Sequence, residues 1–143
     1  MAGRLVKKLA ERDCYTLNEK DTLNTASAML AKHNLGAMPI LNDGKKVVGI
    51  ISERDIARKI HQANFNGNEL ITSIMTKNII SCDLNISVTE LMETMTNKKI
   101  RHMTIMEAEE LKGIVSIGDV VNHVIEKYKD CLLYTSPIPR DDT

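Results

Sequence analysis

Serine, aspartate and glycine recur at matched spacing in two segments whose side chains could bind a polar ligand. The first segment is Gly49-Ile-Ile-Ser52-Glu-Arg-Asp55 and the second is Gly113-Ile-Val-Ser116-Ile-Gly-Asp119. A serine followed three residues later by an acid caps a helix, because its hydroxyl accepts from a free backbone N–H. The helix start also offers N–H donors to an anion, and the carboxylate could accept hydrogen bonds from a ribose diol. The two interpretations are compatible, since a cap orders the helix start that a ligand would use.

The two segments belong to an internal duplication. Shifting the sequence by 65 residues aligns Val6 with Ile71 and Met38 with Met103. One deletion at the turn 42–44, Asn-Asp-Gly, then reduces the shift to 64 and aligns the two glycine–serine–aspartate segments. Asn-Asp-Gly is a strong hairpin signal, and a turn tolerates such a gap. The chain is therefore predicted to contain two copies of one supersecondary unit.

Each copy has the pattern of a β-α-β-β-α unit, so the predicted fold class is α+β. Apolar residues recur at helical spacing in two segments of each copy and form short β-branched runs between them. We assign residues 4–61 to the first repeat and 69–129 to the second, joined by a polar connection at 61–68. The predicted strands are Cys14–Leu17, Ala37–Leu41 and Val47–Ile51 in the first repeat, and Ile79–Cys82, His102–Met106 and Leu111–Val115 in the second.

One unit of this size buries too little surface to be comfortably stable alone. We expect the two units to be packed sheet to sheet about a pseudo-twofold axis and to share a core. That arrangement places a cleft between the repeats, where equivalent groups from both copies converge.

Composition excludes several functional classes. The chain has 143 residues, 43% hydrophobic and 27% charged, with a formal net charge of zero. A neutral chain has no overall attraction to nucleic acid or to an anionic membrane, and no apolar run is long enough to span a bilayer. Three widely spaced cysteines, at positions 14, 82 and 131, are typical of reduced thiols in a cytoplasmic protein. We therefore expect a cytoplasmic protein without nucleic-acid or membrane partners.

The residue patterns argue against an enzyme. The four histidines are not spaced as metal ligands, and neither an HExxH motif nor a G-x-S-x-G elbow occurs. The acidic run at Glu107, Glu109 and Glu110 is typical of a solvated turn. No catalytic residue, catalytic cofactor or metal site is predicted.

The doubled unit resembles the CBS domain family. The resemblance rests on the two glycine–serine–aspartate segments and on the segments Leu35-Gly-Ala-Met-Pro-Ile40 and Ile100-Arg-His-Met-Thr-Ile105, and it covers about residues 4–129. It implies a disc-like regulatory module, often paired with a second module. It also implies an adenosine ligand such as AMP, ADP, ATP, S-adenosylmethionine or a NAD-type dinucleotide.

The resemblance further implies two crosswise sites, each with the acid of one repeat on ribose and strands of the other repeat around base and phosphate. In one site Ser52 and Asp55 would bind ribose, Ile79 and Ile80 would line the adenine, and the phosphate would face Arg101 and His102. The pseudo-symmetric site would use Ser116 and Asp119, with Cys14 and Tyr15 near the base and Gly36 and Ala37 at the phosphate.

The two sites are predicted to be unequal. Gly36 and Ala37 carry no charge where the other site has Arg101 and His102, so only the Asp55 site can neutralise phosphate by this route. Two further departures affect the second repeat: Thr104 replaces the equivalent of Pro39, and Gly118 replaces the equivalent of Arg54. The alternative interpretation of Arg101 is a solvated cation at a strand end, and that of His102 is a hydrogen-bonded surface ring.

The predicted function is a regulatory, energy-sensing module that binds an adenosine nucleotide, with AMP or ATP as the first candidates, and forms a homodimer. The alternative is a dimerising interaction scaffold that binds no nucleotide. The sequence does not distinguish the ligands or name a downstream partner.

The C-terminal segment departs from the repeat pattern. Residues 131–143 resemble the translation of a transposon-end sequencing adapter, and Pro137 and Pro139 oppose continuation of a helix. We predict that the natural chain continues differently after about Asp130. The alternative is a genuine but disordered terminus.

Overall fold

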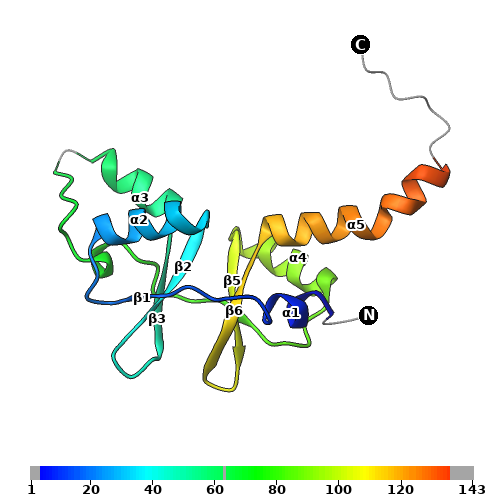
Figure 1. The fold of residues 1–143 in the computed structure, drawn as a ribbon, viewed down its shortest axis with the longest axis horizontal. Helices are drawn as coiled ribbons and strands as arrows, with labels where there is room; N and C mark the ends of the chain where they lie inside the picture. Colours follow the sequence, from blue (N-terminus) through cyan, green and yellow to red (C-terminus); the bar gives the residue numbers. More distant parts are fainter. Residues whose placement is uncertain (1–3, 63, 136–143) are drawn as a thin grey trace, which may run out of the picture.

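The computed structural model describes residues 4–62 and 64–135 and contains the two predicted units (Figure 1). The first unit consists of β1 (Leu17–Asn18), α2 (Leu23–His33), β2 (Ala37–Leu41), β3 (Val47–Ser52) and α3 (Glu53–Ile60). The second consists of β4 (Ser81–Cys82), α4 (Val88–Lys98), β5 (His102–Glu107), β6 (Glu110–Ser116) and α5 (Ile117–Thr135). Helix α1 (Arg4–Leu9) and the short 3-10 helix η1 (Ile71–Ser73) precede the two units in sequence.

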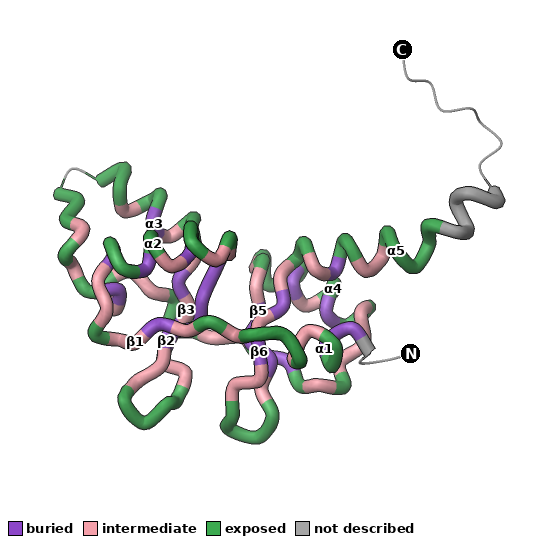
Figure 2. Tube along the Cα trace, viewed as in Figure 1, coloured by how far each residue is buried: buried purple, intermediate pink, exposed green. Residues whose placement is uncertain are grey.

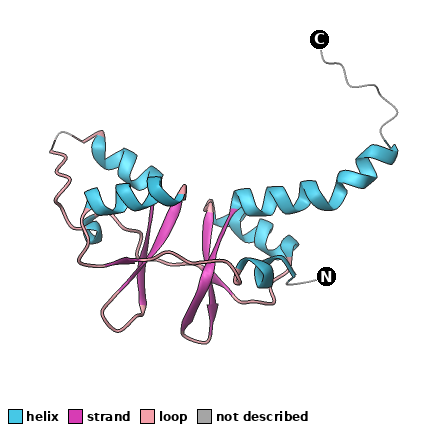
Figure 3. Cartoon of the chain, in the orientation of Figure 1, coloured by secondary structure: helices cyan, strands magenta, loops and turns pink. Residues whose placement is uncertain are grey.

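Each unit is built on a three-stranded sheet with the same topology (Figure 3). β1 is parallel to β2 and β2 is antiparallel to β3, and the order β4-β5-β6 repeats this pattern. Thr104 pairs with Ile114 as Pro39 pairs with Ile50. The replacement of proline by threonine therefore leaves the register of the hairpin unchanged. The Thr104 hydroxyl is fully buried and hydrogen-bonds to Ser81 on β4.

The predicted first strand of each repeat is shorter than expected. Pairing begins only at Leu17 and Ser81, whereas the predicted strands begin at Cys14 and Ile79. The residues ahead of β1 run across both units (Figure 1). A chain that crosses between sheets has no neighbouring strand with which to complete a ladder, so an apolar β-branched run need not form a strand there.

The core consists of two clusters, so the expectation of one shared core was wrong (Figure 2). One cluster joins Met38, Ile40 and Ile51 to the apolar faces of α2 and α3. The other joins Met103, Ile105 and Val115 to the faces of α4 and α5 in the same way. Each unit thus buries its own sheet beneath its own helices.

The leading segments exchange between the two units. Leu5 and Val6 of α1 are buried in the core of the second unit, although they precede the first unit in sequence. Ile71 of η1 is buried in the core of the first unit, and Ile74 and Met75 pack against the same cluster. This crossing of segments links the two units and determines which side chains reach the space between them.

Helix α5 continues to Thr135 and projects beyond the second unit (Figure 1). It therefore includes the start of the segment for which an adapter origin is predicted, while residues 136–143 lie outside the described residues. The origin of that segment stays a prediction. Within residues 4–62 and 64–135, no helix is both long and apolar enough to cross a bilayer.

Candidate functional site

The start of α3 holds Ser52 and Asp55 in a capping box. The Ser52 hydroxyl accepts from the Asp55 backbone N–H at 3.2 Å, and Asp55 Oδ2 accepts from the Ser52 backbone N–H at 2.9 Å. The Ser52 hydroxyl also lies 3.0 Å from Oδ2. No donor from the described part of the chain bonds to Oδ1. The capping interpretation is therefore correct, and one carboxylate oxygen stays open to a ligand.

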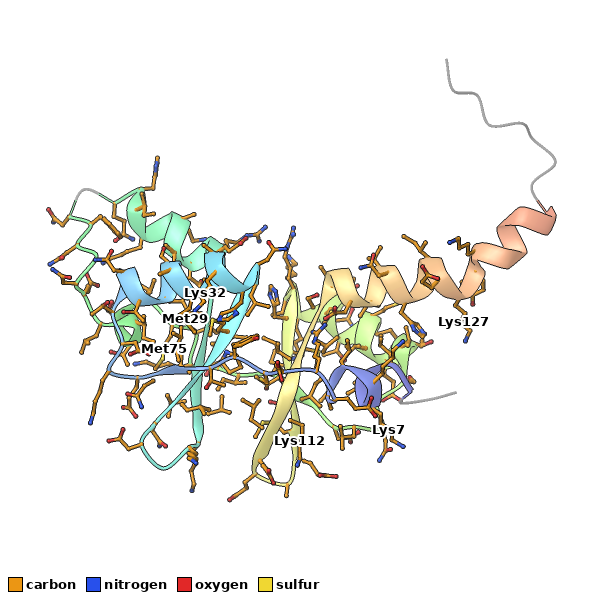
Figure 4. All side chains as sticks on the ribbon, viewed as in Figure 1. Lys7, Met29, Lys32, Met75, Lys112 and Lys127 are labelled. Atoms are coloured by element: carbon orange, nitrogen blue, oxygen red, sulfur yellow. The ribbon has the colours of Figure 1, made fainter. Side chains whose placement is uncertain are left out.

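An exchanged segment brings the predicted adenine residues to this helix start. The Ile50 N–H donates to the Thr76 carbonyl at 3.0 Å, and the Thr76 N–H donates to the Ile50 carbonyl at 2.9 Å. This bridge aligns the segment that follows Thr76 with β3, and both Ile79 and Ile80 are half-buried there. Met75, labelled in Figure 4, lies on the first unit just before the bridge.

The second unit contributes the turn between α4 and β5. Lys99 ends α4 in the left-handed conformation, with φ 55°, as Asn34 ends α2 with φ 53°. The Arg101 carbonyl then accepts from the Ile117 N–H at 2.8 Å, which fixes this turn against the start of α5. Arg101 is exposed and the ring of His102 is half-buried.

These elements surround one cleft of about 780 Å³. A cleft of that volume is within the usual range for small-molecule sites. All six residues predicted for the Asp55 site line it together, and they come from both units: Ser52, Asp55, Ile79, Ile80, Arg101 and His102.

The cleft is more basic than the neutral chain as a whole. Four cations line it, together with only two acids, Glu53 and Asp55. None of the cations belongs to an ion pair within residues 4–62 and 64–135. Unpaired cations in a concave site favour an anionic ligand, because low-dielectric walls concentrate their field. The four are Arg54, Arg58, Lys99 and Arg101.

His102 differs from the other basic residues of the cleft. Burial lowers the pKa of its imidazole below the ordinary value of 6.5, and this effect outweighs the nearby acids Asp119, Glu53 and Asp55. Its ring also lies so close to Gly36 that a side chain at position 36 would have its Cβ 3.1 Å from Nε2. The lowered pKa favours the neutral ring of His102, which can offer the cleft a hydrogen-bonding group instead of a charge.

The residues predicted for the second site do not all line this cleft. Ser116 lines the cleft just described, as do Gly36 and Ala37, but Cys14, Tyr15 and Asp119 do not. Tyr15 stacks on His33, with ring centroids 3.7 Å apart. Cys14 is half-buried, and burial raises the pKa of its thiol despite the opposing charge of Arg12.

Asp119 is held by an arginine that the sequence patterns did not single out. The Arg12 guanidinium donates to both carboxylate oxygens, at 3.0 Å to Oδ1 and 2.8 Å to Oδ2. The duplication gave no signal for this contact, because Arg12 aligns with Lys77 at the shift of 65 and the two cations look alike as a pattern. The sequence patterns also missed Lys99, Arg54 and Arg58 as cleft residues. Arg54 lies within the first glycine–serine–aspartate segment, Arg58 lies three residues after Asp55, and Lys99 directly precedes the segment that begins at Ile100.

No group of three or more histidine, cysteine or acidic side chains in the described ranges 4–62 and 64–135 is placed to hold a metal.

Comparison with known proteins identifies the family. The model of the CBS domain matches twice, over residues 6–62 and 71–126. CBS domain-containing protein YhcV of Bacillus subtilis is 27% identical over 115 residues, which are 80% of this chain and 81% of that protein. The crystal structure of the CBS-domain containing protein ATU1752 from Agrobacterium tumefaciens is 34% identical, with a TM-score of 0.78, and the match covers 84% of this chain and 92% of that one.

A related structure contains bound ligands. The CBS domain pair of protein MJ0100, in complex with 5'-methylthioadenosine and S-adenosyl-L-methionine, is 27% identical to this chain with a TM-score of 0.78. That match covers 85% of this chain and 96% of the other. The doubled sheet–helix unit, its helix-start motif and these similarities agree, and the chain belongs to the CBS domain family, of which it carries two copies.

Proposed function

We propose that this chain is a non-catalytic regulatory module that binds a phosphorylated adenosine nucleotide in the cleft between its two units. Asp55 Oδ1 and the Ser52 hydroxyl bind the ribose, and the apolar side chains of Ile79 and Ile80 contact the adenine. The phosphates face the second unit. The observation that carries the proposal is the single cleft in which Asp55 of one unit and Arg101 of the other both take part.

Charge favours particular members of the ligand class. Four unpaired cations against two acids favour a ligand with several negative charges, because each charge-assisted hydrogen bond is stronger than a neutral one. The related MJ0100 pair binds 5'-methylthioadenosine and S-adenosyl-L-methionine, which carry no phosphate. For this chain we therefore expect affinity to increase from adenosine through AMP to ATP, with S-adenosylmethionine weaker than AMP.

A thermal-shift panel tests the proposal. AMP, ADP, ATP, NADH and S-adenosylmethionine are each added to the purified chain, and a ligand at a hundred times its Kd adds about 2.7 kcal/mol to stability. We expect ATP to raise the melting temperature by roughly 5–10 °C. If every nucleotide leaves it unchanged at millimolar concentration, the module does not bind adenosine nucleotides.

The chain contains a matched pair of variants for this test. Asp55→Ala and Asp119→Ala remove the same capping carboxylate from equivalent helix starts, but only Asp55 lines the cleft. We expect Asp55→Ala to abolish the shift with ATP and Asp119→Ala to preserve it. Loss of the shift in both variants would indicate that the thermal shift depends on the helix cap and not on a contact between Asp55 and the ligand.

The alternative function, a scaffold that acts by self-association, is favoured by an apolar stripe on α5. Val121, Ile125 and Tyr128 follow helical spacing and are each about half exposed, at 49%, 54% and 53%. Exposed apolar patches of this kind mark interaction surfaces. The substitution Ile125→Glu should convert a dimer to a monomer in light scattering and leave the ATP shift intact. A dimer that forms while no nucleotide binds would favour the scaffold.

A further inference from the structure

Arg12 engages the acid that corresponds to Asp55 in the second unit. Its Nη1 donates to Asp119 Oδ1 at 3.0 Å, and its Nη2 donates both to Oδ2 and to the Ile114 carbonyl at 2.8 Å. The Ser116 backbone N–H also donates to Oδ2, at 2.8 Å. Both carboxylate oxygens of Asp119 thus accept hydrogen bonds from the protein, and only 18% of its side chain is exposed.

The first unit lacks this contact. Position 77, which corresponds to Arg12, is a lysine that forms no ion pair with any described residue. The Ile50 carbonyl, which corresponds to that of Ile114, accepts from the Thr76 backbone N–H and not from a guanidinium. The same strand position is therefore completed by the backbone in one unit and by the side chain of Arg12 in the other. Asp55 therefore keeps one carboxylate oxygen without a donor from the described residues, whereas both carboxylate oxygens of Asp119 accept hydrogen bonds.

The exchanged N-terminal segment positions Arg12. Leu5 and Val6 anchor α1 in the core of the second unit, and the Arg12 N–H donates to the Leu9 carbonyl at 3.2 Å. The guanidinium then forms a planar, two-point contact with the carboxylate, a geometry that arginine supports and lysine does not. Burial opposes the charged form of Asp119, yet Arg12 and the Ser116 N–H hold its pKa below the ordinary value. The ion pair thus joins a largely buried carboxylate to an arginine whose side chain is 46% exposed.

We propose that Arg12 closes the second, pseudo-equivalent nucleotide site, so that each chain binds one nucleotide, in the Asp55 cleft. A ribose diol at Asp119 would have to compete with Arg12, because Oδ2 already accepts from Arg12 and from the Ser116 N–H, and Oδ1 already accepts from Arg12. The inference rests on the proposed function and adds to it a stoichiometry and the residue that sets it. In the second unit the Arg12 guanidinium takes the place of the ribose hydroxyls as hydrogen-bond donor to Asp119.

The number of bound nucleotides tests this inference. Equilibrium dialysis with labelled adenosine, which needs no cation to neutralise a phosphate, is expected to give one site per chain for the wild type and two for Arg12→Ala. Adding Asp119→Asn to Arg12→Ala should return the number to one, and adding Asp55→Asn should leave one site that depends on Asp119. Arg12→Lys copies position 77 of the first unit and should also give two sites, which provides a second variant if Arg12→Ala does not fold.

The outcomes separate this inference from the proposed function. Two sites in the wild type, or one site in a folded Arg12→Ala and Arg12→Lys, would overturn the role of Arg12 alone. No site in the wild type and one in Arg12→Ala would overturn binding in the Asp55 cleft, while the closure of the Asp119 site by Arg12 would stand. No site in any variant would overturn both.

Discussion

Gly49 lies on β3 against Met75 and Thr76 of the exchanged segment. A methyl group at this position should displace the cleft residues that follow Thr76. A Cβ at position 49 would lie 2.5 Å from Met75 Sδ, 2.9 Å from its Cγ and 3.1 Å from the Thr76 carbonyl oxygen. The thioether can rotate away, but the carbonyl is fixed by its hydrogen bond to Ile50. The variant Gly49→Ala should therefore push the segment that carries Ile79 away from the strand.

The duplicated chain supplies the control. At the equivalent Gly113 a Cβ would meet Ile105 Cδ1 at 3.5 Å and Ala10 Cα at 3.6 Å, which are ordinary contacts. Replacing glycine by alanine in a compatible conformation stabilises by about 0.4–1 kcal/mol, whereas overpacking costs about 1–3 kcal/mol. We therefore expect Gly113→Ala to be neutral or slightly stabilising. Gly49→Ala should lose about 1–2 kcal/mol.

Differential scanning calorimetry on the two variants measures this difference. For a chain of this size the loss corresponds to a melting temperature roughly 3–8 °C below that of the wild type for Gly49→Ala. Calorimetric titration of the same samples should show weaker ATP binding for Gly49→Ala than for Gly113→Ala. If Gly49→Ala is as stable as Gly113→Ala and binds ATP equally well, the bridge between β3 and the exchanged segment does not position the cleft.

Three further predictions concern the cleft itself. Arg101→Ala should lower the affinity for AMP about tenfold in calorimetric titration, since a hydrogen bond to a charged group contributes about 1.5 kcal/mol or more. The affinity for adenosine should stay unchanged, and an equal loss for both ligands would refute a phosphate contact. Asp55→Asn keeps a side-chain acceptor for the cap and should lower the affinities for adenosine and AMP alike. An unchanged affinity for adenosine would exclude ribose binding by Asp55. The pKa of His102 is lower in the folded chain than the ordinary 6.5, so the unfolded chain binds more protons there and stability falls as the pH falls below about 6.5. The melting temperature of the wild type should therefore decrease relative to that of His102→Gln between pH 7 and pH 5.5, and parallel curves would show that His102 does not titrate differently on folding.

The duplication made much of the fold predictable, together with the helix starts that border the candidate cleft. Residues that occupy equivalent positions in two copies must serve the same local structure, so the capping box at Ser52 and Asp55 and the hairpin from Ala37 could be predicted from the sequence and agree with the structure. The pairing of Asp55 with Arg101 around one cleft followed from the family resemblance. It places an acid from one copy opposite a cation from the other.

The remaining features depend on contacts that a repeat pattern does not encode. The exchange of α1 and η1 between the cores involves apolar residues that would suit either core equally well. The contact of Arg12 with Asp119 joins side chains 107 residues apart in the sequence. Arg12 and the equivalent Lys77 look alike as a pattern, yet only arginine forms the planar contact with two carboxylate oxygens. In the proposed account, differences between the copies, more than their similarities, determine which site binds a nucleotide.

A crystal structure of the chain with ATP in molar excess tests the central claim most directly. We predict density for one nucleotide in the cleft, with its ribose hydroxyls within hydrogen-bonding distance of Asp55 and its phosphates at Arg101, while Arg12 still holds Asp119. A nucleotide bound at Asp119 with the Asp55 cleft empty would contradict the account.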